Sequence, residues 1–126
     1  VNSVSCAAAF TQMAAVAALE GPKDEVEAMI AEFGIRRRLI ADGLRSIPGV
    51  NCPEPEGAFY AFPSIKGTGL TSAEFEDRAM NQAGVALLSG SAFGEFGEGY
   101  VRLSYANSQD NIKQAIDKLD KMVRAI

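Results

Sequence analysis

The sequence contains no histidine. This absence removes the commonest general base, the Ser-His-Asp and Cys-His catalytic arrangements, and most metal sites. Any chemistry must therefore come from carboxylates, lysine, tyrosine, arginine or a cofactor, and we expect no metal site.

Cysteine is also scarce, with only Cys6 and Cys52 in the chain. Their spacing fits neither a zinc site nor the disulfide framework of a small secreted protein. We interpret both as inert thiols and expect a cytoplasmic protein.

Long apolar runs and excess positive charge are missing as well. No run approaches the ~18 apolar residues of a membrane span. The net charge of −4 gives no indication of nucleic acid or an anionic membrane as partner. The first residues lack the basic region of a signal peptide and an initiator methionine, so we expect the chain to derive from a longer protein.

The composition itself is that of a globular protein. The chain has 126 residues, of which 48% are hydrophobic and 22% charged. This length and composition predict one domain, residues 1–126, with a single core.

Two helices are expected in the first part of the chain. Residues 5–20 are rich in alanine, with Ser3 or Ser5 as the cap and Gly21-Pro22 as the stop. This helix has little polar face, which is typical of a helix covered by a partner surface. A second helix, residues 23–46, carries an apolar stripe and a charge pattern matching its dipole. Arg37 lies on that stripe, and we interpret it as a stem that reaches toward solvent.

Two more helices have clear start signals. Thr71 and Glu74 form a capping box, and the helix they begin is expected to end near Gly84. Ser108 is expected to cap a last helix that runs to Ile126.

Four strands are expected between these helices, at residues 50–52, 58–62, 85–88 and 100–105. The third is continuously apolar, which predicts cover on both faces. The element order predicts an α/β fold, an α+β two-layer sandwich in which a mixed or antiparallel sheet is packed by helices.

The most informative stretch is Gly97–Ala106, a turn followed by a strand. Because side chains alternate along a strand, three apolar residues face the core and three polar ones face away. The core set is Val101, Leu103 and Tyr105, and the opposite set is Tyr100, Arg102 and Ser104. Arginine is a planar fork that grips carboxylates or phosphates with two hydrogen bonds. Arg102 is therefore either a strand arginine that contacts water or a clamp for a substrate carboxylate.

Two neighbouring segments bear on this choice. The loop at residues 89–99 is rich in glycine, so its backbone can approach a ligand, although it matches no phosphate-binding motif. Phe59 lies in an aromatic strand, where it could pack in the core or line a pocket. Lys66 is interpreted as a solvated loop lysine.

Seven motifs together resemble one family. They are Gln12–Pro22, Arg36–Arg38, Ile47–Val50, Pro55–Tyr60, Ala83–Ala86, Gly90–Gly94 and Tyr100–Ala106. In this order and spacing they resemble the C-terminal small domain of the fold type I, pyridoxal-phosphate-dependent class I and II aminotransferases, of the aspartate aminotransferase type.

The resemblance implies specific roles. Arg102 would bind the substrate α-carboxylate, Phe59 would line the pocket, and the loop at residues 90–94 would close near the substrate. Residues 1–22 would form the helix that leads out of a large domain absent from this chain. Ser89 stands where the family commonly has proline, which should loosen the loop slightly.

The resemblance also implies what lies elsewhere. The intact enzyme would be a homodimer that uses pyridoxal 5'-phosphate to move an amino group between an amino acid and a 2-oxo acid. The catalytic lysine and the cofactor-binding residues would lie upstream, so this chain should bind no cofactor and be inactive alone.

Two alternatives remain open from the residues. The chain could be a freestanding α/β carboxylate-binding or regulatory module, or an assembly domain that dimerises through its alanine-rich helix. The amino-acid substrate is also open, with aspartate, aromatic and broad specificities all compatible.

Overall fold

The computed structural model describes residues 6–126. These divide into two compact units, the first ending at Ala31 and the second comprising Glu32–Ile126. Helix α1 (Ala9–Glu20) lies in the first unit, and helix α2 (Asp24–Arg45) begins there. Each unit is described by itself.

Helix α1 exposes apolar side chains. None of its residues is buried, and Phe10 and Leu19 are 79% and 75% exposed. The helix ends before Gly21 as predicted, but the prediction of its start is wrong: it begins at Ala9 and not at residue 5. Its N-cap is Ala8, which has no side-chain acceptor and makes no capping bond, so neither serine caps the helix. The predicted caps Ser3 and Ser5 lie outside the described residues.

Helix α2 confirms the predicted bounds within one residue at each end. Its apolar stripe is buried only in the second half, at Ile40, Ala41 and Leu44. In the first half, which belongs to the first unit, Met29 and Ile30 remain more than half exposed.

The other two helices begin where the sequence predicts. The capping box of α3 (Ser72–Asn81) is present, and Gly84 beyond its end has a φ of +64°. Helix α4 (Gln109–Arg124) begins after Ser108, whose hydroxyl accepts a hydrogen bond from the Asn111 N–H.

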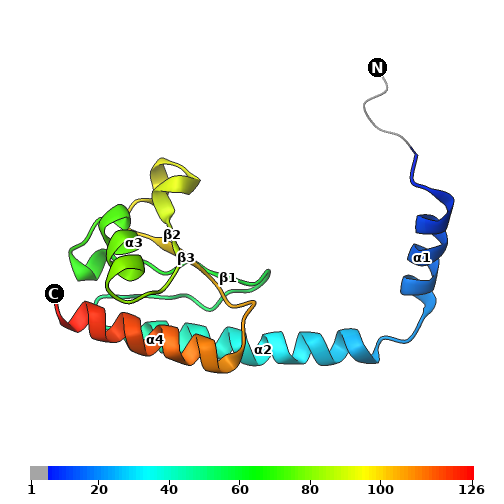
Figure 1. The fold of residues 1–126 in the computed structure, drawn as a ribbon, viewed down its shortest axis with the longest axis horizontal. Coiled ribbons are helices and arrows are strands. Elements are labelled where there is room, and N and C mark those ends of the chain that lie inside the picture. Colours follow the sequence, from blue (N-terminus) through cyan, green and yellow to red (C-terminus); the bar gives the residue numbers. More distant parts are fainter. Residues whose placement is uncertain (1–5) are drawn as a thin grey trace, which may run out of the picture. The chain divides into compact units, whose positions relative to one another are not determined.

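Three short strands form the sheet, in the order β1-β3-β2 (Figure 1). Both neighbours of the central strand β3 (Val101–Ser104) run antiparallel to it. Tyr60 of β1 (Tyr60–Ala61) pairs with Ser104, and Leu88 of β2 (Leu88–Ser89) pairs with Arg102. The central strand is thus the one that carries Arg102.

The sheet has one covered face and one open face. Ala61, Val101 and Leu103 are buried in a core shared with α2, α3 and α4. Side chains of the opposite face, such as Tyr60 and Phe62, are more than a third exposed. This helix layer against an antiparallel sheet confirms the predicted two-layer fold class.

The strands are shorter than predicted. Residues 50–52 make only an isolated bridge between Asn51 and Ser64. Strand β1 begins late because Ala58 has a φ of +57°, which extended backbone cannot include. The expectation that residues 85–88 are covered on both faces is wrong: Val85 and Leu87 are buried, whereas Leu88 is 42% exposed. The physical reason is that Leu88 pairs with Arg102 and so lies on the open face of the sheet, where side chains stay exposed.

Three 3₁₀ turns complete the second unit: η1 (Lys66–Thr68), η2 (Gly90–Phe93) and η3 (Glu95–Gly97). The last two lie between β2 and β3. No helix within residues 6–126 is both long and apolar enough to cross a membrane.

Candidate functional site

Arg102 lies on the open face of the sheet, between two aromatic rings. Its Cζ atom is 4.4 Å from the ring centroid of Tyr60 and 4.3 Å from that of Phe93. Tyr60 comes from β1 at one edge of the sheet, and Phe93 comes from η2, which follows the strand at the other edge. A guanidinium near ring faces is stabilised by cation–π attraction. We call Tyr60 and Phe93 the ring pair.

The polar edge of this guanidinium makes no bond to the protein. Within residues 6–126, Arg102 forms no ion pair and donates no hydrogen bond, whereas Arg36, Arg37, Arg45 and Arg124 all pair with carboxylates. The side chain is only partly buried. Its donors are therefore free for an external carboxylate, and the surrounding rings keep their environment less polar than water.

Further aromatic side chains extend this surface. The Phe62 ring lies 6.0 Å from Phe93, edge to face, and stacks on Tyr100 at 5.5 Å. The Phe59 ring lies 4.5 Å from that of Tyr60. We name this set the aromatic face; it comprises Phe59, Tyr60, Phe62, Phe93 and Tyr100.

Phe59 belongs to this face and not to the core. Its side chain is 41% exposed and meets Phe33 at a centroid distance of 6.4 Å. Tyr105 fixes its backbone: the Tyr105 N–H donates to the Phe59 carbonyl, and the Tyr105 hydroxyl donates to the Ala58 carbonyl, both at 2.9 Å. The two predicted site residues are thus linked through Tyr60, which contacts both.

The loop before Phe59 is held by Arg37, whose partners the sequence pattern did not identify. The Nη2 atom of Arg37 lies 3.2 Å from the Glu54 carboxylate, and its Nη1 donates to the Pro55 carbonyl at 3.4 Å. The predicted stem does reach the partly exposed surface, where its charge is paired with a carboxylate of the loop. The pattern could show only that the residue lies on the apolar stripe, and the partner lies on another element.

The loop that carries Phe93 is held by backbone packing. A Cβ atom at Gly90 would collide with the Gly97 carbonyl oxygen, and one at Gly97 would collide with the Gly90 carbonyl oxygen. The Gly90 N–H also donates to the Tyr100 carbonyl at 2.8 Å. The close approach that the glycine-rich stretch predicted is thus made within the loop itself.

Ser72 fixes the backbone where this loop leads into β3. Its buried hydroxyl accepts hydrogen bonds from the Gly99 N–H at 2.8 Å and the Tyr100 N–H at 3.2 Å. Its own N–H donates to the Glu98 carboxylate at 2.9 Å. The capping box identified the helix start but gave no sign that the next serine bonds across the fold.

Ser89, the residue where the resemblance predicts proline, is tethered on both sides. Its N–H donates to the Glu76 carboxylate at 3.1 Å, and its hydroxyl lies 2.7 Å from that of Ser91. Proline has no N–H and could not make the first of these bonds.

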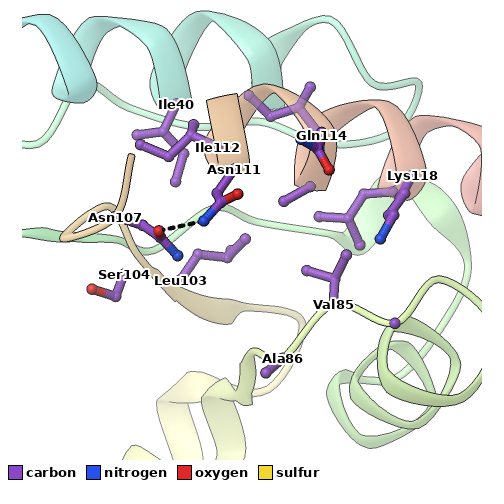
Figure 2. A pocket seen from close by; sticks show the side chains of 14 residues that line it. Ile40, Val85, Ala86, Leu103, Ser104, Asn107, Asn111, Ile112, Gln114 and Lys118 are labelled. Atoms are coloured by element: carbon purple, nitrogen blue, oxygen red, sulfur yellow. Dashed lines mark hydrogen bonds between the residues drawn. The ribbon is translucent and has the colours of Figure 1, made fainter. Parts of the chain in front are cut away.

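A hollow in the described chain lies away from this face. Figure 2 shows a cavity of about 280 Å³ between α4 and the segment at Val85 and Ala86. Polar side chains on its wall include Asn107 and Asn111, joined by a hydrogen bond of 2.9 Å. Neither Arg102 nor Phe59 lines it. The candidate site is therefore the open aromatic face and not this cavity.

Cysteine thiols and clusters of metal-binding side chains are the other groups that could take part in chemistry. Both Cys6 and Cys52 are free, and burial raises the pKa of the Cys52 thiol, with Arg45 opposing the effect. A raised pKa disfavours the reactive thiolate, which supports an inert Cys52. Residues 6–126 hold no cluster of three side chains able to bind a metal ion.

Comparison with known proteins decides the family. The family model for aminotransferase class I and II matches residues 1–119. The chain belongs to this family. An aspartate aminotransferase of Pyrococcus abyssi is 43% identical over 124 residues, and an aromatic-amino-acid aminotransferase 2 of Thermococcus litoralis is 40% identical over the same number. Each alignment covers 97% of this chain and 32% of the relative.

Solved aminotransferase structures show the same fold. The aromatic aminotransferase of Pyrococcus horikoshii superposes with a TM-score of 0.88 at 39% identity, covering 95% of this chain and 32% of that one. The chain thus spans about a third of the length of the relatives it matches.

Proposed function

We propose that this chain is the small domain of an aminotransferase that moves an amino group between an amino acid and a 2-oxo acid. In this proposal Arg102 binds the α-carboxylate of the substrate, and Phe59 forms part of the pocket wall. Family membership supports the reaction class, and the relatives' names include both aspartate and aromatic-amino-acid aminotransferases.

One observation carries the proposal, namely a guanidinium with no internal anion. Arg102 lies between aromatic rings with its hydrogen-bond donors unused by residues 6–126. A carboxylate gripped by two parallel N–H donors is fixed in both distance and direction. Such a grip would orient the Cα–H bond of an amino acid for proton removal.

Neither the aromatic face nor the cavity offers the set of groups that the family's cofactor needs. Pyridoxal phosphate needs a lysine amine, an acidic partner for its ring nitrogen and donors for its phosphate. Lys66 instead lies over the Tyr100 ring at 5.0 Å. The cavity is lined by Lys118 but by no aspartate, glutamate or arginine. We therefore assign cofactor binding and proton transfer to residues outside this chain, and we expect the isolated chain to show no transamination with added cofactor.

The remaining features of the proposal concern the intact protein. The large domain that holds the cofactor would be the principal partner of this chain, and a homodimer in the cytoplasm would be the working form. The exposed apolar side chains of α1 support a partner surface that covers this helix.

Replacing Arg102 by lysine in the full-length enzyme tests the clamp. The lysine ammonium cannot donate the two parallel hydrogen bonds of the guanidinium, so one charge-assisted hydrogen bond to the substrate carboxylate is lost. KM for both amino acid and 2-oxo acid should therefore rise about tenfold or more. The matched control is Arg38→Lys, because Arg38 is exposed and takes part in no ion pair within the described chain. If Arg102→Lys leaves KM at the control value, the clamp assignment is wrong.

The isolated chain offers a second check. Measurable turnover of an amino acid and a 2-oxo acid by the 126-residue chain with added cofactor would show that its catalytic groups are present after all. Tight binding of either substrate to the chain alone, measured by calorimetry, would favour the freestanding carboxylate-binding module instead.

A further inference from the structure

We propose that Tyr60 and Phe93 are positioning residues, which hold the Arg102 guanidinium in the plane and direction needed to receive the substrate carboxylate. This inference rests on the proposed function of Arg102. It assigns the rings a role that acts through the arginine and not through direct contact with the substrate.

The first argument is that only rings restrain the guanidinium. An arginine side chain has several rotatable bonds, and most functional arginines are fixed by a carboxylate or a carbonyl. Within residues 6–126, Arg102 has neither, and its close contacts are the two rings at 4.4 and 4.3 Å. Rings near the guanidinium face attract its charge and leave the N–H groups at its edge unblocked.

The second argument is that both rings are themselves braced. Tyr60 packs against Phe59, whose backbone is bonded to Tyr105. Phe93 packs edge-on against Phe62, which is stacked on Tyr100 with an angle of 6° between the rings. A restraint that is itself rigid lowers the entropy lost when the arginine binds its ligand.

The third argument is that the two rings come from separate elements. Tyr60 lies on β1, and Phe93 lies on η2, whose position depends on the Gly90–Gly97 backbone contact. The arginine is therefore aligned only when both elements are in place. The orientation of the guanidinium therefore depends on the folded domain and not on the arginine side chain alone.

The test uses the full-length enzyme with pairs of variants that remove or keep each ring. Tyr60→Leu and Phe93→Leu should each raise KM for amino acid and 2-oxo acid about fivefold, with a smaller change in kcat, because one cation–π contact is lost. Tyr60→Phe and Phe93→Tyr keep the rings and should stay within about twofold of the parent KM. Leucine variants with the parent KM, or ring-retaining variants as impaired as the leucine ones, would overturn the proposal.

A double-mutant cycle separates positioning from general structural damage. In an Arg102→Ala background, Phe93→Leu should produce no further rise in KM, because a ring that acts only through the arginine has nothing left to align. A further rise would show that the ring contacts substrate directly or supports the fold, and would overturn the positioning role.

The same measurements distinguish this inference from the proposed function. If Arg102→Ala itself leaves KM unchanged, the carboxylate clamp fails, and the positioning role fails with it. If Arg102→Ala raises KM but the leucine variants do not, the clamp stands and only the role of the rings is refuted. Thermal unfolding of each variant, measured in parallel, reports any loss of fold.

Discussion

Replacing Gly90 by alanine should damage both the stability of the domain and its substrate binding. The added Cβ would collide with the Gly97 carbonyl oxygen and lie 2.6 Å from the Tyr100 carbonyl oxygen. Both obstacles are backbone atoms, so no side chain can rotate away to relieve the contact. The loop itself must therefore move.

The size of the effect follows from what that movement breaks. The Tyr100 oxygen must recede by roughly 0.8 Å to reach ordinary contact, and it is also the acceptor of the Gly90 N–H bond at 2.8 Å. Overpacking a close contact and losing a partly buried hydrogen bond together cost about 3 kcal/mol of unfolding free energy. Because η2 carries Phe93, the displaced loop should also raise KM about fivefold in the full-length enzyme by loss of one ring contact.

Equilibrium urea unfolding of the 126-residue chain measures the first effect. The chain contains no tryptophan, so helical circular dichroism is the appropriate signal. Gly57→Ala is the matched control, since a Cβ there meets nothing within 4 Å and needs no left-handed backbone. We expect the control to change the unfolding free energy by less than about 0.5 kcal/mol.

A Gly90→Ala variant as stable as the Gly57→Ala control would refute the reasoning, because it would mean that the Gly90–Gly97 contact does not constrain the loop. Loss of stability with an unchanged KM would support the packing argument but show that the position of η2 does not affect substrate binding.

Two further predictions concern the helices. Thr71→Ala removes the hydroxyl that accepts the Glu74 N–H at 3.2 Å, and should lower the unfolding free energy by about 1 kcal/mol, whereas Thr71→Ser should restore most of it in urea unfolding. Hydrogen bonds from Arg36, and next from Gln109, lower the pKa of Glu32 below its ordinary value, although partial burial opposes them. A lowered folded-state pKa gives stability that is present above the unfolded-state pKa and is lost as the pH falls through the folded-state pKa. The difference in urea midpoint between the parent and Glu32→Gln should therefore shrink from pH 7 to pH 3; a constant difference would contradict the assignment.

The local signals in the sequence predicted local structure well. The capping box at Thr71, the cap at Ser108 and the left-handed stop at Gly84 are confirmed because each depends on backbone groups within a few residues. The alternation of Val101, Arg102 and Leu103 also holds, since the period of a strand alone decides which side chains share a face.

The strands were less predictable. Apolar content could not show that Leu88 lies at a sheet edge with one open face, because this depends on which elements pack beside it. The late start of β1 comes from the left-handed conformation of Ala58. Alanine seldom adopts this backbone conformation, so the residue type at this position could not predict it.

By itself, the sequence determined the family, the starts of α3 and α4 and the face of β3 on which Arg102 lies, because these follow from motifs in register, capping residues and local periodicity. Only the tertiary structure decided what surrounds that arginine. The pattern placed Tyr100 and Ser104 beside it, whereas its contacts are Tyr60 and Phe93, which reach it from neighbouring elements. Periodicity predicts which way a side chain points, but strand pairing and loop packing decide which side chains from distant parts of the chain it meets.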